Sequence, residues 1–257
     1  MRKEYFTNSN LKLIRLDKLL VERGLVSTRT RAEQVITTYG VMVDGILVTK
    51  TGKKFTEDVL IQLIQEEIPW VSKGALKLLA ALEKWQIDVA DKVCLDIGAS
   101  TGGFTEVLLH HGASKIFAVD VGHGQMHPKL TSEKKITNIE KTHVRQLTSK
   151  TITQEADIMA VDVSFISLTK VLPFLHPFLK DDARVILLIK PQFEVGKENL
   201  NKNGIVIKKA LYTETIENIK NSASQNQLQF IDYIESPILG GDGNREFLAY
   251  FCKSNGN

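Results

Sequence analysis

The sequence predicts an α/β protein in two unequal domains: a small α+β domain at the N-terminus and a larger domain built on a mostly parallel sheet. Three observations support this prediction. The chain has 257 residues, which is more than one small domain needs. From Val93 onward, apolar runs alternate with helical stretches, which is the rhythm of parallel strands buried between helices. Pro69 interrupts regular structure between the two regions.

The N-terminal region is predicted to form two helices followed by strands. Apolar residues at helical spacing indicate one helix over 13–23, and Ser27 is suited to open a second helix. The dipeptide Asp44-Gly45 between two β-branched runs predicts a hairpin. Residues 59–64 alternate like a further strand. These elements would form one compact domain.

The larger region is predicted to hold a doubly wound sheet, because strands and helices alternate along it. The expected strands are 93–97, 116–119, 158–161, 184–189, 227–234 and 246–251. The expected helices are 74–85, 104–111, 168–179 and 208–224. For the whole chain we expect a flexible N-terminus at 1–12, a small domain at 13–65, a linker at 66–70 and a larger domain at 71–257.

Composition describes an ordinary globular protein, with 43% hydrophobic and 25% charged residues. The net charge of +3 does not by itself indicate a nucleic-acid partner. Cys94 and Cys252 lie in apolar runs and are expected to be buried thiols in a reducing compartment, with no cluster that suggests a metal. The N-terminus lacks the apolar core of a signal peptide, and no apolar run is long enough to span a bilayer. We therefore expect a cytoplasmic protein without a membrane partner.

A glycine-rich turn follows the first strand of the larger region. Such a turn lets the backbone approach a ligand closely, and the helix after it aims N–H groups at that ligand. Asp96 lies at the strand end, and Asp120 ends the next strand, where a carboxylate can accept hydrogen bonds from a ribose diol. The turn lacks the G-x-G-x-x-G pattern of dinucleotide-binding proteins, which disfavours a nicotinamide-dependent dehydrogenase.

This combination resembles the S-adenosylmethionine-binding motifs of class I methyltransferases, whose domain has a Rossmann-like fold. In those enzymes the backbone around the glycines holds the methionine portion, and the second acidic residue holds the ribose. The residues expected to bind this cofactor are Asp96, Gly98, Ala99, Ser100, Thr101, Gly102, Gly103, Phe104, Asp120, Val121, His143 and Asp162. His123 and His127 lie in loops after strands and are weaker candidates for the same site.

Two charged residues follow later strands. Asp162 should face the ligand, because ligands bind outside the carboxyl ends of parallel strands. Lys190 ends an apolar strand before Pro191, a position suited to proton abstraction. The alternatives are a carboxylate at a helix N-terminus for Asp162 and a rim lysine on a phosphate for Lys190. The chain lacks the Asn/Asp-Pro-Pro-Tyr/Phe run of many amino-group methyltransferases, which disfavours methylation of a base nitrogen.

Several runs, in order, resemble the TlyA family, whose members are described as haemolysins or as ribosomal RNA 2′-O-methyltransferases. The catalytic half also resembles the wider FtsJ-type 2′-O-methyltransferases. The matching runs are 70–78, 96–104, 162–168, 190–197 and 240–247. The resemblance covers nearly the whole chain from Leu13. It implies methyl transfer from S-adenosylmethionine to a cytidine ribose of ribosomal RNA, without a metal.

The same resemblance implies a catalytic tetrad of Lys77, Asp162, Lys190 and Glu246. In the implied mechanism the 2′-hydroxyl attacks the sulfonium methyl group in line, while Lys190 accepts or guides the proton. Asp162 and Glu246 would hold and tune Lys190, and Lys77 would stabilise negative charge on oxygen. Lys73 competes with Lys77 for its place and is otherwise expected to contact RNA.

The N-terminal region resembles the S4-type RNA-binding domain on the runs 15–25 and 27–32 and on the hairpin at 41–45. Its cations can neutralise phosphates and position RNA without reading bases, although a solvated helix face would look similar. No aromatics are interleaved with them, so base stacking is not indicated there. The expected RNA-binding residues are Lys12, Arg15, Lys18, Arg23, Arg29, Arg31 and Lys73.

Ribosomal RNA or a ribosomal subunit is the implied partner, and a monomer is the default expectation. We hypothesise that the linker, with Trp70, couples RNA docking to cofactor binding. Two other functions stay open at this point: a non-catalytic RNA-binding assembly factor and a membrane-lytic protein. The first is disfavoured by matches at all four tetrad positions. The second is disfavoured by the lack of a transmembrane or long amphipathic basic helix.

Overall fold

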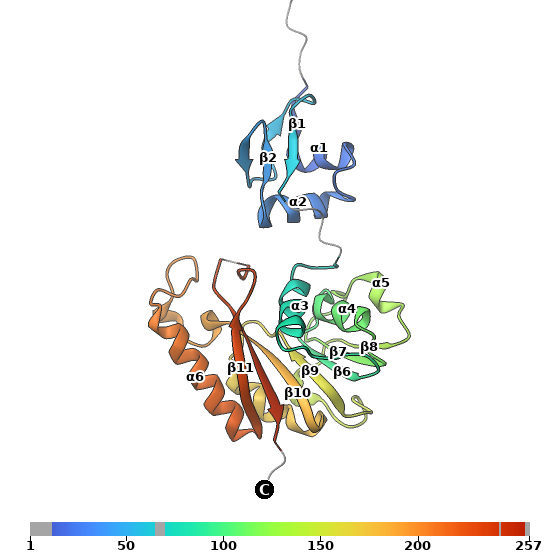
Figure 1. Ribbon diagram of the computed structural model, residues 1–257, viewed down its shortest axis with the longest axis vertical. Helices are drawn as coiled ribbons and strands as arrows, with labels where there is room; N and C mark the ends of the chain where they lie inside the picture. The colour runs from blue at the N-terminus through green and yellow to red at the C-terminus, as the bar shows by residue number, and fades with distance from the viewer. Residues whose placement is uncertain (1–11, 65–69, 242, 255–257) are drawn as a thin grey trace, which may run out of the picture. The chain divides into compact units, whose positions relative to one another are not determined.

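The chain divides into two compact units, Met1–Pro69 and Trp70–Asn257, in this computed structural model (Figure 1). The structure describes residues 12–64, 70–241 and 243–254. The expected flexible N-terminus apart from Lys12, and the expected linker apart from Trp70, lie outside the described residues. Each unit has a hydrophobic core of its own.

The N-terminal unit packs two helices against short strands around one core. The expected hairpin is present: Asp44 and Gly45 have φ values of 50° and 76°, which match the left-handed turn that the dipeptide predicts. The second helix is capped by Thr28 rather than Ser27, and the Thr28 hydroxyl accepts from the Arg31 N–H at 3.2 Å. The elements are β1 (Ile14–Arg15), α1 (Leu16–Glu22), α2 (Arg29–Thr38), β2 (Val41–Val43), β3 (Ile46–Val48), β4 (Lys54–Phe55) and β5 (Ile61–Leu63).

The larger unit is built on a seven-stranded sheet in the order β11-β12-β10-β9-β6-β7-β8. All neighbours from β8 to β10 are parallel, and β12 runs antiparallel between β10 and β11. The chain moves outward from β6 to β7 and β8, then returns to place β9 on the other side of β6. The strands are β6 (Val93–Ile97), β7 (Lys115–Val119), β8 (Ile136–Ile139), β9 (Ala156–Val161), β10 (Leu179–Ile189), β11 (Leu228–Glu235) and β12 (Phe247–Lys253).

Helices cover both faces of this sheet (Figure 1). One face packs against α3 (Ala75–Lys84) and α4 (Gly103–His110), and the other packs against α6 (Ala210–Gln225). A short helix, α5 (Pro128–Thr131), closes a small separate cluster. The predicted α/β class with a mostly parallel sheet is therefore confirmed. The reversal of strand order between β6 and β9 creates the switch point at which ligands bind in such sheets.

The expected helix over 168–179 is wrong. The segment forms three 3-10 turns instead, at Leu168–Lys170, Leu172–Phe174 and His176–Phe178. Two prolines, Pro173 and Pro177, lack the N–H that an α-helix interior needs, and their rings crowd the preceding turn. The apolar residues still reach the core, which is why their spacing looked helical.

Three smaller expectations also change. The first helix begins at Leu16 rather than at residue 13, because β1 pairs with β4. The strand β8 was not expected, since its four residues, Ile-Thr-Asn-Ile, show too little apolar character. Cys94 is buried as expected, but Cys252 is only half-buried.

The sheet centre should carry much of the stability of the larger unit. Leu188 on β10 is 1% exposed, so Leu188→Ala would leave a cavity as well as lose apolar burial. We expect the free energy of unfolding to fall by about 2–5 kcal/mol, measured by urea denaturation of the full chain. The matched change Leu239→Ala, at a side chain that is 53% exposed, should cost less than about 0.5 kcal/mol. Equal losses in both variants would contradict this core assignment.

Candidate active site

A cavity of about 430 Å³ opens at the carboxyl ends of β6, β7 and β9, at the switch point of the sheet. Its wall is formed by the turns that follow these strands and by the segment 142–144 after β8. Side chains of Ile97, Val144 and Ile166 make part of this wall apolar, while Asp120 and Asp162 add two carboxylates. Cavities of this size and mixed lining are typical of small-molecule sites.

Gly98 allows the ends of β6 and β9 to meet. Its φ of 88° lies in the left-handed region, and a Cβ at this position would overlap the carbonyl oxygen of Asp162. The Asp162 N–H donates to the Ile97 carbonyl at 2.8 Å, and the Gly98 N–H donates to the Val119 carbonyl at 2.8 Å. Three strand ends are therefore tied together by backbone atoms, and only glycine fits at their centre.

Asp120 is fixed in the cavity wall by the turn opposite it. One of its oxygens accepts from the Ser100 N–H at 2.8 Å, and the other accepts from the Gly122 N–H at 2.6 Å. Ser100 itself has a φ of 47°, which is uncommon for a residue with a side chain. A carboxylate has further lone pairs, so Asp120 can still accept from a ligand hydroxyl in its expected place.

Asp96 lies behind the cavity rather than in its wall. It is fully buried, and one oxygen accepts from the Thr105 hydroxyl at 2.6 Å, which fastens the end of β6 to α4. Its other oxygen has no hydrogen-bond partner among the described residues. Burial raises the pKa of Asp96 to about 7, because removal from water disfavours the charged form.

The expected cofactor-binding residues thus fall into two groups. Those that line the cavity are Gly98, Ser100, Asp120, Val121, His143 and Asp162. Those that lie outside its lining are Asp96, Ala99, Thr101, Gly102, Gly103 and Phe104. The second group shapes the turn and the start of α4, as the buried side chains of Ala99 and Phe104 illustrate.

Gly103 serves the placement of a different helix, α3. A Cβ on Gly103 would overlap the hydroxyl of Ser72 and lie 3.1 Å from the N–H nitrogen of Ala75. The start of α3 is also held by Glu106 on α4, which accepts from the Val71 N–H at 2.5 Å. The close packing of α4 on α3 therefore sets where the first turns of α3 lie.

The structure brings the four tetrad residues together as two ion pairs. On α3, Lys77 lies 2.5 Å from Glu246, measured from Nζ to Oε2. At the ends of β10 and β9, Lys190 lies 2.6 Å from Asp162, measured from Nζ to Oδ1. Lys190 also donates to the Ser164 hydroxyl at 2.8 Å. Lys190 is thus ion-paired with a carboxylate and hydrogen-bonded to a hydroxyl.

Sheet register makes the two ion pairs neighbours. Ile189 on β10 pairs with Phe247 on the antiparallel strand β12. One position further along the pair, Lys190 follows Ile189 and Glu246 precedes Phe247, so these two residues lie opposite each other. Side chains directly opposite on antiparallel strands have Cβ atoms about 5 Å apart. The Lys77 and Glu246 side chains are 8% and 3% exposed, whereas those of Lys190 and Asp162 are 11% and 21% exposed. The first pair is buried, and the second reaches the cavity through Asp162, which lines it, while Lys190 lies outside the lining.

Two residues that the sequence did not single out complete this edge. Ser164 is bonded to Lys190 and lines the cavity. Glu194 accepts from the Ser167 hydroxyl at 2.6 Å and from the Leu168 N–H at 2.8 Å, and its burial raises its pKa. Glu194 therefore ties the turn after β10 to the loop after β9. Ser164 and Glu194 lie in the runs 162–168 and 190–197, which carry the family resemblance. Their position in those runs is the sequence feature that could have marked them as site residues.

The three candidate histidines have different environments. His143 lines the cavity, and its Nδ1 accepts from the Arg145 N–H at 3.2 Å at the start of a 3-10 turn. His123 pairs with Glu140 at 2.8 Å and lies outside the lining. His127 caps α5 and also lies outside it. Only His143 is placed to touch a ligand in this cavity.

In the N-terminal unit, a buried carboxylate gathers two of the expected RNA-binding arginines. Asp17 is fully buried and accepts from Arg15 Nε and Nη2 at 3.0 and 2.9 Å and from Arg29 Nη2 at 2.8 Å. These hydrogen bonds, led by that from Arg15, hold the pKa of Asp17 well below its usual range. The Arg15 and Arg29 side chains remain 45% and 59% exposed. Asp17 thus presents two fixed guanidinium groups at the surface.

The other expected RNA-binding residues are not part of this cluster. Lys18 pairs with Glu22 at 3.3 Å along α1. Arg23 donates to the backbone carbonyls of Glu57 and Val59, so it has a structural contact. Three residues remain: Arg31 bonds to a neighbouring glutamine on α2, Lys12 is exposed, and Lys73 is half-buried before α3. Arg15 and Arg29 are thus the two expected RNA-binding residues that one buried carboxylate holds together.

No helix within the described ranges is both long enough and apolar enough to cross a bilayer.

Comparison with known proteins agrees with this division of the chain. The larger unit matches the family model described as FtsJ-like methyltransferase over residues 70–253. The N-terminal unit matches the S4 domain model over residues 14–61.

Individual relatives resemble nearly the full chain. The 16S/23S rRNA (cytidine-2′-O)-methyltransferase TlyA of Mycobacterium tuberculosis is 38% identical over 92% of this chain and 88% of its own length. Hemolysin A of Brachyspira hyodysenteriae is 36% identical over 93% of this chain and 99% of its own length. A solved hemolysin-type structure from Streptococcus thermophilus has a TM-score of 0.75 and 36% identity, covering 95% of this chain and 90% of that one.

Asp96 should give the stability of the larger unit a distinct pH dependence. Its pKa is about 7 in the folded chain and near 4 when unfolded, so the folded state binds more protons between these values. Its contribution is therefore present below about pH 4 and is lost as the pH rises through about 7. The side chain in Asp96→Asn is uncharged at every pH. We therefore expect the free energy of unfolding of this variant, measured by urea denaturation, to decrease less between about pH 4 and pH 7 than that of the wild type. Asp181→Asn, at a side chain that is 77% exposed, should keep the wild-type slope; an unchanged slope in Asp96→Asn would refute the assignment.

Proposed function

The chain belongs to the FtsJ-like methyltransferase family and to its TlyA-type members, and from this premise we propose that it methylates a ribose 2′-hydroxyl of ribosomal RNA with S-adenosylmethionine as donor. The target proposed is a cytidine, as the name of the mycobacterial relative states for that protein. The observation that carries the proposal is the ion pair between Lys190 and Asp162, a carboxylate that lines the cavity.

The cavity fits the proposed donor. S-adenosylmethionine would supply a methyl group already activated by its sulfonium charge. Asp120, at the end of β7, offers fixed carboxylate oxygens to a ribose diol. Val144 and Ile166 offer apolar surface to an adenine ring, and Asp162 adds negative charge toward a cationic ligand. These features support the choice of cofactor.

Lys190 is the proposed proton acceptor or guide. Its Nζ lies 2.6 Å from Asp162 and 2.8 Å from Ser164, two residues that line the cavity, so its position is defined. In its neutral amine form Lys190 would accept the proton of a bound hydroxyl as that oxygen attacks the methyl group, whereas the ammonium form has no lone pair and would donate to the oxygen. We assign Glu246, opposite Lys190 in the sheet register, to tuning the charge of the lysine. Lys77, paired with Glu246, would favour negative charge developing on the oxygen.

The N-terminal unit is the proposed docking element. Arg15 and Arg29 offer two guanidinium groups whose geometry is set by Asp17, and such groups bind phosphates with two parallel hydrogen bonds. Phosphate contacts position RNA without reading its sequence, so target choice would rest on RNA shape. A target inside a helix would have to be flipped out. We propose a monomer that acts on ribosomal RNA or subunits in the cytoplasm.

Lys190→Ala should separate cofactor binding from methyl transfer. Loss of the proton acceptor should lower kcat/KM for transfer to ribosomal subunits by about 100-fold to 10,000-fold, with little change in cofactor affinity. The measurement is incorporation of labelled methyl groups at a ribose that becomes resistant to alkaline hydrolysis. Lys84→Ala, at an exposed lysine at the far end of α3, is the matched control and should stay near wild type. Cofactor binding by the wild type without transfer to any ribosomal RNA would instead favour the non-catalytic alternative.

Arg29→Ala should weaken RNA docking while leaving the N-terminal unit folded, because Arg15 still pairs with Asp17. Loss of one phosphate contact should lower the slope of log affinity against log salt by about 1. Binding to ribosomal RNA can be measured by filter retention over a salt series. Lys134→Ala, which removes an exposed charge from the larger unit, should leave the slope unchanged. Identical slopes for the two variants would remove Arg29 from the proposed interface.

A further inference from the structure

Ser164 connects Lys190 to the cofactor cavity. Its hydroxyl accepts from the Lys190 Nζ at 2.8 Å, and Ser164 is exposed and lines the cavity. Lys190 itself lies outside the lining, and its side chain is only 11% exposed. Of these two bonded residues, Ser164 is therefore the one that a ligand in the cavity can reach.

The backbone is fixed on both sides of Ser164. Two residues before it, the Asp162 N–H donates to the Ile97 carbonyl at 2.8 Å. The residue after it, Phe165, has a φ of 63°, a left-handed conformation that costs a non-glycine residue energy. Such a conformation persists where surrounding contacts hold the segment in place. Ser164 therefore lies in a segment with a defined path.

A ring contact ties this segment to the turn that follows Lys190. The ring centroids of Phe165 and Phe193 lie 5.1 Å apart. The Phe193 N–H in turn donates to the Lys190 carbonyl at 2.9 Å. The loop with Ser164 and the strand end with Lys190 are thus joined by contacts other than their own hydrogen bond. These contacts help to keep the hydroxyl and the amine within bonding distance of each other.

The hydrogen bond between Ser164 and Lys190 can run in either direction. A serine hydroxyl has one proton to donate and lone pairs that accept, so it accepts from an ammonium and donates to a neutral amine. While it donates to the amine of Lys190, its oxygen can still accept a proton from a second hydroxyl. The 2.8 Å separation lies within the range over which side chains transfer protons.

We propose that Ser164 is a further catalytic residue, which relays the proton of the ribose 2′-hydroxyl to Lys190. This inference rests on the proposed function and assigns a role to a residue outside the tetrad. Ser164 receives the substrate proton at its Oγ as it gives its own proton to the Nζ of Lys190. Lys190 is then the final proton acceptor, although it does not line the cavity.

The proposed step is balanced in atoms and charge. The 2′-oxygen forms a bond to the methyl carbon, while the bond from that carbon to sulfur breaks and leaves its electron pair on sulfur. The substrate proton moves to Ser164, and the serine proton moves to the neutral amine of Lys190. Ser164 ends unchanged, and Lys190 ends as an ammonium. The Asp162 carboxylate, 2.6 Å from that Nζ, stabilises the new positive charge.

Ser164→Ala removes the relay and leaves the final acceptor in place. Single-turnover transfer of labelled methyl groups to ribosomal subunits is the suitable measurement, because product release can limit steady-state rates. We expect the rate to fall by about 100-fold, at the lower end of the range for proton-transfer groups, since Lys190 is still present. Ser164→Thr keeps a hydroxyl and should recover most of the rate. Both variants should bind S-adenosylhomocysteine like the wild type, which excludes a collapsed cavity.

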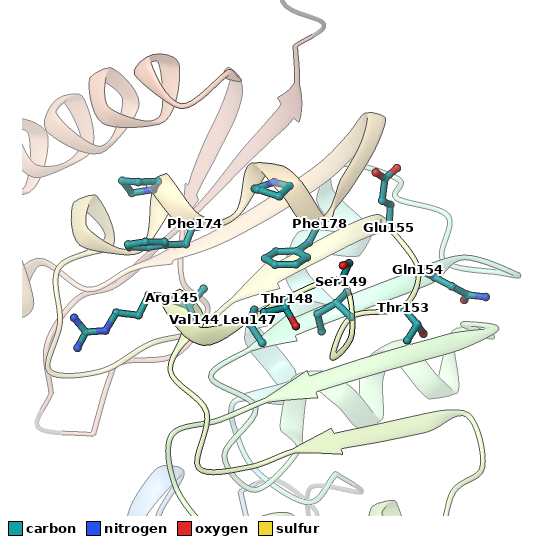
Figure 2. Close-up of a pocket in the computed structure, with 13 residues that line it drawn as sticks. Val144, Arg145, Leu147, Thr148, Ser149, Thr153, Gln154, Glu155, Phe174 and Phe178 are labelled. Carbon is teal, nitrogen blue, oxygen red and sulfur yellow. The ribbon is translucent and has the colours of Figure 1, made fainter.

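Ser149→Ala is the matched control, because it removes the hydroxyl of an exposed serine elsewhere on the unit. Ser149 lines a different hollow, of about 480 Å³, whose wall is shown in Figure 2. None of the described residues that line this hollow belongs to the tetrad. Transfer by Ser149→Ala should therefore stay at the wild-type rate. A wild-type rate in Ser164→Ala as well would overturn the relay.

Rates in mixtures of light and heavy water separate a relay from a merely structural role. A relay moves two protons in one step, so the wild-type rate should follow a curved line against the deuterium fraction. The slow transfer that remains in Ser164→Ala should follow a straight line, because one proton moves. A straight line for the wild type overturns the relay and leaves Ser164 as a residue that positions Lys190. Equal curvature in both proteins also overturns it, since the second proton would then not belong to Ser164.

The same transfer assay distinguishes the two proposals. Transfer by the wild type, with a full rate or the wrong isotope behaviour in Ser164→Ala, overturns the relay alone and leaves the proposed function standing. A wild-type protein that binds the cofactor and transfers no methyl group to ribosomal RNA overturns the proposed function, and the relay with it.

Discussion

The close approach of two backbone segments, at Gly98 and Asp162, determines the arrangement of the whole carboxyl edge. Because a Cβ at Gly98 would overlap the Asp162 carbonyl, the loop after β9 can lie directly against the turn after β6. The Asp162 N–H then bonds to Ile97, which fixes the direction in which the Asp162 side chain leaves the sheet. That direction places its carboxylate beside Lys190, at the rim of the cavity. The glycine-rich turn therefore organises both the cavity and the charged pair beside it.

The two ion pairs of this edge have different physical roles. Lys77 and Glu246 are almost wholly buried, and such a pair costs desolvation that good geometry must offset. Gly240 contributes to that geometry, since a Cβ there would overlap the Glu246 carboxylate. Lys190 and Asp162 are more exposed than the first pair, and Asp162 lines the cavity, where a ligand would meet its charge. In the proposed reaction, the buried pair would hold its charges in place beside the more accessible pair, and charges fixed in advance lower the barrier to forming new charge.

The N-terminal unit holds two of its cations in place with a buried carboxylate. At the N-terminal unit, Asp17 holds Arg15 and Arg29 in fixed positions, which suits the rigid spacing of phosphates in folded RNA.

The sequence by itself determined the fold class, the Asp44-Gly45 hairpin and the positions of Asp162 and Lys190 at strand ends, because periodicity and turn chemistry are local properties. It also predicted a helix over 168–179, where two prolines impose 3-10 turns. Only the tertiary structure decided that Lys77 bonds to Glu246, which lies 169 positions away in the chain. That contact depends on the register of β12 in the sheet and on the packing of α4 against α3. It likewise placed Asp96 inside the core, because burial is set by which faces pack together and spacing along the chain does not record it.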